Sequence, residues 1–528
     1  MIHEQIQQEA RLQVIDISEI QRLARAKVEE EQATFAQPLT SFTDTELLDA
    51  VKSGEVGDAR IFIRLNTGKL CYDHAAGLWY EFSGHSWQLD ELDKTLAALD
   101  EVVNLYAKLA HQISLQVVAA TKAGDKDLVK ELEKIESLVR KKIGALQKRH
   151  HRENVLVLAA AGAESLGIAG NEWDQNPYLL SFANGTLDLQ TLSFRPGRPA
   201  DYIKTACPTE WKGIATPAPC WERFIYEILD GDEEVISYLK RLLGYSIAGL
   251  TVEHILPILW GAAGRNGKGT LLEVLGKVLG GLAGVVPGEL MLEQRNPRSS
   301  AAPSPDIMDL RGKRLTWASE TDEGRALNSG RVKLLCGGDT LVGRPPFGKR
   351  QVAFQPTHTI FLLTNFRPRV NPEDAALWDR IHLIEFSVSF VDHPVGANQR
   401  PRDKDLPSKL QEEASGIAAW LMAGFIEWRT IGLRPPPKVV NATRQYRRSE
   451  DLIQQFFEEC CVVRPEAFCR GGEIFEAYQK WCEERGARSR RKKFYEKLTA
   501  DFNSFRSESG KVYQGIGLKV PDGMTQSP

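Results

Sequence analysis

One stretch of the chain restricts the fold more than any other, because an apolar run passes through a glycine-rich turn directly into a lysine and a helix-forming segment. The apolar run spans 254–260, the turn spans 261–267, and the helix-forming residues follow Lys268. An apolar run bounded by turn residues is typical of a buried parallel strand. Glycines allow successive backbone N–H groups to close on an anion at the positive end of the following helix. This order predicts an α/β sheet with a phosphate-binding loop at the end of one strand.

The loop departs from the usual phosphate-loop motif at two places. Five residues separate Gly261 from Gly267 where the motif has four, so either the loop is one residue longer or Ala262 takes the place of the first glycine. Gly269 stands where a hydroxyl normally binds Mg²⁺, and Thr270 follows one place later. We expect ATP and Mg²⁺ at this loop, and a glycine-rich turn without a ligand is the alternative. The expected nucleotide contacts are Gly261, Gly264, Arg265, Asn266, Gly267, Lys268, Gly269 and Thr270.

Three further apolar runs follow at 314–319, 359–364 and 381–386. Together with the first run, they predict the parallel strands of one sheet between residues 250 and 390. The carboxyl ends of parallel strands meet at one edge of a sheet, which is where ligands bind in open α/β folds. Polar residues that follow these runs are therefore candidates for a shared site.

Two such residues are Glu320, after the first of these three runs, and Asn365, after the second. A carboxylate at this place can orient water and hold Mg²⁺ through its shell, and an amide can sense the γ-phosphate or position the attacking water. Taken alone, Glu320 is more simply a surface acid and Asn365 a residue that starts a turn. Because lysine, acid and amide occur in order and in strand contexts, we predict a nucleotide-hydrolysing site with Lys268 at the β and γ phosphates. Glu320 and Thr270 are the expected metal contacts.

A third catalytic candidate is Arg380, which follows the segment 374–379. It can act as an arginine finger that reaches across a subunit boundary and stabilises transferred charge. A structural ion pair with the adjacent Asp379 is an equally good interpretation. The sequence leaves both open.

Between the acid and the amide lies a predicted hairpin at 339–354, formed by two strand-like runs around a Pro-Phe-Gly turn. Its tip combines cations, which pair with phosphates, and an aromatic ring, on which a base can stack for roughly 1–3 kcal/mol. We expect the tip to contact single-stranded DNA, and an ordinary surface hairpin is the alternative. The residues expected to make this contact are Arg344, Phe347, Lys349 and Arg350.

At 528 residues the chain is too long for one core, and its length suggests roughly two to four domains. Turn residues and changes of composition divide it into six segments. They are a helical leader (1–58), an N-terminal α+β region with long helices (59–215), a helical linker or collar (216–249), the P-loop ATPase core (250–390), a helical lid and linker (391–449) and a DNA-binding domain (450–528).

The N-terminal region changes character along its length. Short aromatic and branched runs broken by glycine come first, and those at 60–65 and 77–87 are predicted to form hairpins. From 91 to 170, apolar residues recur at helical spacing, which predicts long helices that turn near Gly124. A charge run at 140–152 is either a solvated helix face or a nucleic-acid contact.

The last domain is predicted to contain two helices and a short hairpin that ends with 512–518. A helix starting near Ser489 carries a basic run beside apolar residues that are available for packing. A basic run is usually a solvated face, but its position in this domain favours contact with DNA. The residues expected to make this contact are Arg490, Arg491, Lys492 and Lys493.

The composition argues against several protein classes. A hydrophobic share of 42% with a charged share of 26% is ordinary for a folded protein and excludes wholesale disorder or a fibrous class. No apolar run reaches the roughly 20 residues of a membrane span, and the polar N-terminus does not resemble a signal peptide, so we expect a cytoplasmic protein without membrane contact. A net charge of −3 restricts any nucleic-acid contact to local surfaces. The eight cysteines lack paired CxxC spacing and are expected to be reduced thiols.

Several blocks of the sequence resemble the helicase part of the phage and plasmid primase-helicase family, which is related to the poxvirus primase-helicases and placed in superfamily 3. The blocks are 176–189, 264–270, 310–320, 333–339, 361–368, 377–381 and 415–420. The resemblance implies an AAA+-like hexamer that hydrolyses ATP at subunit interfaces and pulls one DNA strand through its pore. It also implies a winged-helix domain at the C-terminus, and it gives Lys268, Glu320, Asn365 and Arg380 the roles argued above.

The resemblance further implies a replicative DNA helicase of a phage, prophage or plasmid, acting in the cytosol of a bacterial host. Its expected partners are single-stranded and forked DNA, copies of itself, and a separate primase or replication initiator. Fuller members of the family carry an N-terminal primase domain with a carboxylate cluster for metals. Residues 1–170 offer mainly helical segments and no convincing pair of such acids, so primase activity is not expected in this chain. An ATP-driven helicase loader and a non-catalytic origin-binding platform are the alternatives.

Overall fold

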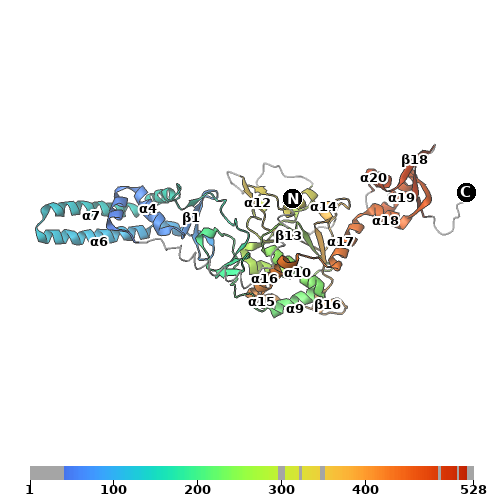
Figure 1. The fold of residues 1–528 in the computed structure, drawn as a ribbon, viewed down its shortest axis with the longest axis horizontal. Helices are drawn as coiled ribbons and strands as arrows, with labels where there is room; N and C mark the ends of the chain where they lie inside the picture. The colour runs from blue at the N-terminus through green and yellow to red at the C-terminus, as the bar shows by residue number, and fades with distance from the viewer. Residues whose placement is uncertain are drawn as a thin grey trace.

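The computed structural model describes residues 41–294, 304–319, 324–344, 351–485, 489–507 and 510–519. In Figure 1 a helical arm projects from one end of the molecule, a mixed α/β region occupies the middle, and a small domain lies at the other end. The part of the helical leader that precedes residue 41 lies outside the described residues. Among the helices that are described, none has the length and apolar character needed to cross a membrane.

The arm is a helical hairpin braced by shorter helices. Its helices are α3 (Asp44–Lys52), α4 (Glu55–Asn66), α5 (Lys94–Ala97), α6 (Asp100–Ala123), α7 (Lys126–Leu146) and α8 (Arg149–Ala159). Gly124 ends α6 in the left-handed conformation with φ 76°, and the side chain of Asp125 accepts a hydrogen bond from the N–H of Leu128 to begin α7. The predicted turn near Gly124 is therefore confirmed.

The hairpin predicted at 60–65 is wrong, because these residues belong to α4. Alternate residues of this run are apolar, which fits a strand, but Ile61, Phe62 and Leu65 also share one helix face and are buried in the core of the arm. Close packing of α4 on α3 favours the helix, since a Cβ on Gly57 would lie 2.0 Å from the carbonyl oxygen of Ala50. The local pattern of 60–65 fits both a strand and a helix, and the close packing of α4 on α3 favours the helix.

Two small sheets connect the arm to the central region. The first contains β1 (Leu70–Asp73), β2 (Leu78–Phe82), β3 (Trp87–Leu89) and β4 (Gly167–Ile168) in the order β3-β2-β1-β4. Its antiparallel β2–β3 pair confirms the hairpin predicted at 77–87. The second contains β5 (Leu179–Phe182), β6 (Gly185–Asp188) and β7 (Ser193–Arg195), and it is followed by the short helix η1 (Pro199–Asp201). Arg314 of the central region donates hydrogen bonds to the carbonyl oxygens of Pro177 and Leu179, which ties this sheet to the core.

The central region is a mixed α/β fold built on a five-stranded parallel sheet. Its strands are β8 (Leu256–Trp260), β9 (Ala283–Val285), β10 (Leu315–Ser319), β13 (Thr359–Thr364) and β14 (Ile381–Glu385), in the order β14-β8-β13-β10-β9. Four of these strands match the four predicted apolar runs, and the edge strand β9 was not predicted. Every residue of β13 is buried, as expected for a strand covered on both faces. The strand that precedes the glycine-rich loop is therefore flanked by β14 and β13, and the carboxyl ends of β8, β13 and β10 share one edge of the sheet.

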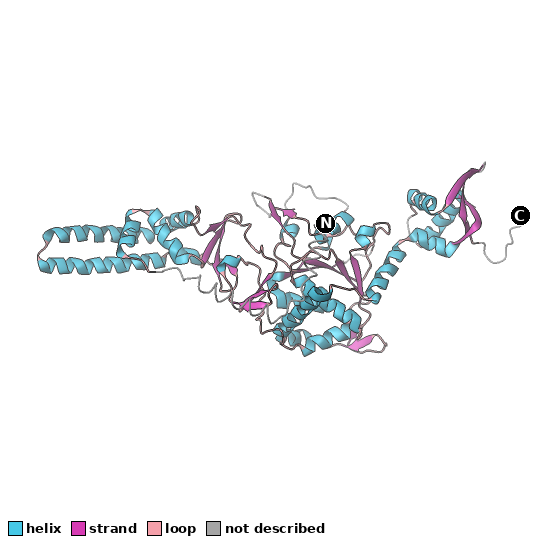
Figure 2. Ribbon diagram, viewed as in Figure 1, coloured by secondary structure: helices cyan, strands magenta, loops and turns pink. Residues whose placement is uncertain are grey.

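Helices cover both faces of this sheet (Figure 2). One face carries α9 (Pro219–Ile228), α10 (Glu233–Ile247), α11 (Lys268–Leu279), α15 (Leu406–Glu412) and α16 (Ala414–Ile431). The other carries α13 (Ser329–Cys336), α14 (Ala375–Trp378) and α17 (Pro437–Glu450). The segment before the sheet meets the segment after it where α10 crosses α16. The two helices pack so closely that a Cβ on Gly244 would lie 2.1 Å from the backbone nitrogen of Phe425.

Short elements complete the central region. They are η2 (Gly280–Leu282), η3 (Gly288–Leu290), α12 (Pro305–Met308), β11 (Leu341–Gly343), β12 (Val352–Phe354), β15 (Ser389–Val391) and β16 (Gln399–Pro401). The antiparallel pairing of β11 with β12 confirms the stem of the hairpin predicted at 339–354.

The C-terminal domain contains α18 (Leu452–Cys460), β17 (Cys461–Arg470), α19 (Gly471–Glu484), α20 (Arg491–Asp501), β18 (Asn503–Ser507) and β19 (Gly510–Leu518). The β18–β19 hairpin confirms the one predicted to end with 512–518, and α20 is the predicted basic helix. The strand β17 was not predicted, since its middle is the polar, proline-bearing stretch where the pairing with β19 shifts register between Val463 and Phe468. The sheet order is β17-β19-β18. All eight cysteines of the chain are free.

Candidate nucleotide-binding site

The glycine-rich loop joins β8 to α11, and Lys268 is the first residue of that helix. A Cβ on Gly261 would lie 2.7 Å from the carbonyl oxygen of Phe386 and 3.1 Å from Nζ of Lys268, so this position has no room for a side chain. Gly267 has φ 84° and a Cβ there would meet Ile228 at 2.4 Å. Ala262 is exposed. The crowded glycine positions are thus 261 and 267, which favours the longer loop over a motif that starts at Ala262.

The loop is held from both sides without a ligand. Asn266 is buried, and its Nδ2 donates to the carbonyl oxygen of Ala263 at 2.7 Å. The backbone N–H of Phe390, in β15, donates to the carbonyl oxygen of Arg265 at 2.8 Å, and Arg265 itself takes a left-handed φ of 60°. The stretch between Gly261 and Asn266 is exposed, so preorganised backbone N–H groups face an open side.

Lys268 is buried, with 6% of its surface exposed, and its ammonium has only neutral partners among the described residues. Its Nζ donates to Oδ1 of Asn365 at 3.0 Å and to the carbonyl oxygen of Gly261 at 3.3 Å. Burial lowers the pKa of Lys268 to about 8. An anion at the loop would give the ammonium the negatively charged partner that it lacks among the described residues. The site therefore fits a phosphate group.

Asn365 directly follows β13, and its place is fixed by its neighbours. The indole Nε1 of Trp260 donates to the carbonyl oxygen of Asn365 at 3.1 Å, and Trp260 lies opposite Thr364 in the β8–β13 register. The sequence placed Lys268 and Asn365 in one site from strand order alone, and the structure brings the two side chains into contact.

Arg367 belongs to this site but was not predicted. Its guanidinium lies 3.9 Å from the ring centroid of Trp260, and its Nη2 donates to Oε1 of Glu385 at 3.1 Å. Arg367 therefore keeps the indole of Trp260 in place, and that indole keeps Asn365 in place. In the sequence, the only hint of this role is that Arg367 follows Asn365 by two residues. That spacing does not indicate that Arg367 stacks on Trp260 of the neighbouring strand.

Of the two remaining catalytic candidates, the structure describes Arg380 but not Glu320. The strand β10 ends at Ser319, opposite Leu363 of β13, and Glu320 lies just outside the described residues, so its role stays a prediction. Arg380 is half-buried between α14 and β14, and its Nη1 donates to the carbonyl oxygen of Ala376 at 2.5 Å. Its Nε is buried without a hydrogen-bond partner in the described part of the chain. No ion pair joins Arg380 to the described Asp379, so the structural alternative is not observed.

Two residues are predicted to contact the metal. The structure describes Thr270 but not Glu320. Thr270 lies half-buried in the first turn of α11, and Gly269 beside it has open space around its Cα. The residues that the structure describes contain no group of three or more His, Cys, Asp or Glu side chains arranged to hold a metal. Thr270 and Glu320 therefore stay predicted metal contacts.

The residues expected to contact DNA occupy different environments. Arg344 directly follows β11, and its backbone is hydrogen bonded to Ser304, while the predicted contacts Phe347, Lys349 and Arg350 lie outside the described residues. On α20, the ammonium of Lys493 lies 3.4 Å from a carboxylate oxygen of Glu373 in the central region.

The other three basic residues of the run, Arg490, Arg491 and Lys492, are exposed, and Arg491 also packs over the ring of Phe475 at 5.5 Å. These three cations are thus open to phosphates, and Lys493 is held by a surface ion pair.

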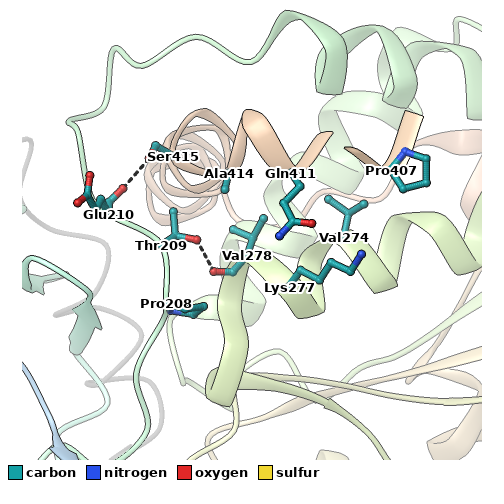
Figure 3. A pocket seen from close by; sticks show the side chains of 10 residues that line it. All are labelled: Pro208, Thr209, Glu210, Val274, Lys277, Val278, Pro407, Gln411, Ala414 and Ser415. Atoms are coloured by element: carbon teal, nitrogen blue, oxygen red, sulfur yellow. Dashed lines mark hydrogen bonds between the residues drawn. The ribbon is translucent and has the colours of Figure 1, made fainter. Parts of the chain in front are cut away.

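A separate cavity of about 310 Å³ lies beside the other end of α11 (Figure 3). Lys277 and Val278 line it from α11, and Gln411 and Ser415 line it from the facing helices. Thr209 donates to the carbonyl oxygen of Val278 at 2.7 Å on its near wall. This cavity does not include any residue of the glycine-rich loop.

Residues 59–230 match the family described as D5 N terminal like. The chain is 28% identical over 429 residues to "Putative helicase L207/L206" of Acanthamoeba polyphaga mimivirus, which covers 78% of this chain and 43% of the relative. It is 26% identical over 285 residues to "Putative helicase 022R" of Frog virus 3, covering 52% and 28% of the two chains. It is 22% identical over 330 residues to "Putative primase C962R" of African swine fever virus, covering 58% and 33%.

The chain thus spans less than half the length of each of these relatives. Among solved structures, the C-terminal region of NrS-1 aligns with a TM-score of 0.34 at 11% identity over 58% of this chain and 79% of that one, a similarity too low to define the fold. The matched domain and the viral relatives together make this chain similar to proteins named putative helicases and putative primases.

Proposed function

We propose that this chain is an ATP-dependent replicative DNA helicase of a phage, prophage or plasmid that moves along single-stranded DNA as a ring. The observation that carries the proposal is the contact between Lys268 and Asn365 at the carboxyl edge of β8 and β13, beside a preorganised glycine-rich loop. The names of the viral relatives support a helicase over other nucleotide enzymes.

The loop suggests how ATP is handled. The backbone N–H groups of 262–267 and the Lys268 ammonium bind the phosphates. Thr270 and Glu320 would hold Mg²⁺, which would supply positive charge beside the phosphates. In the described state, Lys268 donates to Oδ1 of Asn365. When the ammonium turns to a phosphate oxygen, the amide of Asn365 is released to hold the γ-phosphate or the attacking water. The pair thus couples nucleotide binding to assembly of the hydrolytic site.

The open side of the loop and the position of Arg380 support hydrolysis between subunits. The exposed stretch between Gly261 and Asn266 leaves one side of the nucleotide uncovered by this chain. Arg380 has no carboxylate partner in the described residues, and we propose that it completes the site of a neighbouring copy as an arginine finger. The sheet order, with β13 between the loop strand and β10, supports an AAA+-like superfamily 3 core in a hexameric ring.

We propose that the C-terminal domain is a winged helix. Its α19 and α20 followed by the β18–β19 hairpin suit that description, and the exposed Arg490 and Lys492 suit contact with the DNA backbone. The tip of the β11–β12 hairpin is the proposed contact with the strand in the pore.

The test is ATP hydrolysis with and without single-stranded DNA, followed by unwinding of a forked duplex, with subunit number from light scattering. Lys268→Ala should abolish both activities. Lys277→Ala is the matched control, because this exposed lysine lies on the same helix but away from the loop. Hydrolysis without unwinding would favour an ATP-driven loader, and DNA binding with no hydrolysis in the wild type would favour an origin-binding platform.

A further inference from the structure

The sheet of the C-terminal domain has two faces of different character. Its inner face carries Cys469, Tyr513 and Ile516, which are buried in a core with α18, α19 and α20. Neighbouring residues on a strand point to opposite faces, so Phe468 lies on the outer face. Phe468 is 53% exposed and Phe505 is 48% exposed. Two large aromatic rings are therefore left outside a core that is already rich in aromatic residues.

These two rings lie side by side. Their centroids are 6.2 Å apart with an interplanar angle of 77°. Across the sheet, Phe468 lies opposite Gln514, and Phe505 lies opposite Val512. In the same two rows the outer face also carries Asn503 beside Gln514. The surface thus presents two ring faces bordered by amide side chains that can bond to the edges of a base.

The outer face of the sheet carries a cation that suits a polyanion. The three strands contain four cations and one acid, which are Arg464, Arg470, Arg506, Lys511 and Glu466. Arg506 and Lys511 pair in the row next to Phe505 and so lie on the opposite face, where Lys511 donates to Thr499 of α20. Arg470 lies in the row of Phe505, and its nearest acid is Glu473 at 3.4 Å. Both members of that pair are 56% exposed, so solvent screens it and Arg470 can turn to a phosphate at little cost.

We propose that the outer face of the sheet β17-β19-β18 binds single-stranded DNA by stacking bases on Phe468 and Phe505. Arg470 meets the backbone phosphate beside them. Aromatic side chains on a sheet accept unstacked bases, and every base has a ring face, so such a platform tolerates any sequence. A duplex keeps its bases stacked and does not offer these faces. The inference rests on the proposed DNA-dependent function, but it concerns a different surface from the basic run of α20.

Fluorescence anisotropy of the full chain with a labelled oligothymidine tests the platform. Phe468→Ala and Phe505→Ala should each weaken binding about tenfold, and the double variant should weaken it further. Val463→Ala is the matched control, because this residue of β17 is 61% exposed and should leave binding unchanged. Arg470→Ala should reduce the slope of log affinity against log salt by about one.

Two comparisons distinguish base stacking from purely electrostatic binding and from general apolar docking. On a strand of equal length without bases, the wild type and the double variant should bind equally. Phe505→Leu keeps apolar bulk without a ring and should lose affinity as the alanine variant does, whereas Phe505→Trp should keep it. If the leucine variant binds like the wild type, the face is a general apolar docking surface and the proposal is wrong.

The outcomes also separate this inference from the proposed function. If the double phenylalanine variant binds oligothymidine as tightly as the wild type, the platform is overturned while the helicase proposal stands. If the wild type binds no single-stranded DNA, both fall together. Loss of binding in the double variant, with ATP hydrolysis in the absence of DNA unchanged, is the expected result.

Discussion

Lys142 in the N-terminal arm, with 9% of its side chain exposed, and the buried Lys268 at the glycine-rich loop are both largely removed from solvent, but their surroundings are opposite. The ammonium of Lys142 lies 3.0 Å from a carboxylate oxygen of Asp58, and Asp58 also accepts hydrogen bonds from Tyr106 and His151. Lys268 contacts only the neutral oxygens of an amide and a backbone carbonyl among the described residues. One buried cation is neutralised within the fold, and the other is not.

The difference separates a structural charge from a functional one. A buried charge is costly unless it is paired, so a fold that keeps one unpaired does so where a ligand can complete the pair. The arm uses its charge network to join α4, α6, α7 and α8. We propose that the loop keeps its cation for a phosphate that binds from outside. Four predictions test this comparison.

The largest effect is expected from Asp58→Ala in the arm. Removal of the carboxylate leaves Lys142 buried and unpaired, which should cost about 3–5 kcal/mol of local stability. Hydrogen exchange of peptides from α4 and α8 measures this as lost protection. Asp125→Ala is the matched control, because it removes only an exposed helix cap of the same arm and should cost about 1 kcal/mol. Equal losses in the two variants would mean that the buried network contributes no more than the cap.

The second effect is expected from Lys268→Met and appears in activity, not in stability. ATP hydrolysis should fall about 100- to 1000-fold, the usual cost of removing a preorganised donor from a charge-stabilising site. The melting temperature without nucleotide should not fall, because methionine removes a buried charge that has no carboxylate partner in the described residues. A drop in stability comparable to that of Asp58→Ala would make Lys268 a structural cation and would contradict the comparison.

The core and its site could be predicted because parallel buried strands appear as continuous apolar runs. Their order then places Lys268 and Asn365 at one edge of the sheet, without knowledge of any contact. The stacking of Arg367 on Trp260 could not be predicted in this way, since it depends on side-chain directions across two strands. Strand order predicted that Lys268 and Asn365 lie together, and only the packing reveals that Trp260 and Arg367 hold Asn365 in place.

Two of the elements that were wrongly predicted or missed have local patterns that mislead. The run 60–65 fits both a strand and a helix face, and only the contact of Gly57 with Ala50 decides for the helix. The strand β17 contains a polar stretch at 464–467 that the register shift accommodates without pairing. In both cases the deciding partner is distant from the pattern, in the neighbouring helix or strand.

The third prediction concerns pH. Burial lowers the pKa of Lys268 to about 8 in the folded chain, so between about pH 8 and 10.5 the unfolded chain carries more protons at this residue. The contribution of Lys268 to stability should therefore rise with pH across this window. Bound phosphate favours the ammonium, so a non-hydrolysable ATP analogue should bind about tenfold more weakly at pH 9 than at pH 7 and take up about one proton at pH 9.

Titration calorimetry in two buffers with different heats of ionisation measures that proton uptake. Lys268→Met should show none, and Lys277→Ala should behave like the wild type. If the wild type takes up no proton at pH 9, the ammonium keeps its charge in the free loop, and the contrast with Lys142 is then one of partners alone.

The smallest effect is expected at the indole that holds Asn365. Trp260→Phe removes the N–H that donates to the carbonyl oxygen of Asn365 but keeps a ring face for Arg367. Loss of one such hydrogen bond costs about 1 kcal/mol, so kcat for ATP hydrolysis should fall about fivefold. KM for ATP should change little, because Lys268 and the loop still bind the phosphates. Trp481→Phe removes an equivalent indole bond to Glu459 in the C-terminal domain and should leave both constants unchanged. A rise in KM with constant kcat would instead mean that Trp260 supports ATP binding through Lys268. The role of the Asn365 amide would then be to position the Lys268 ammonium, and not to act in the hydrolytic step.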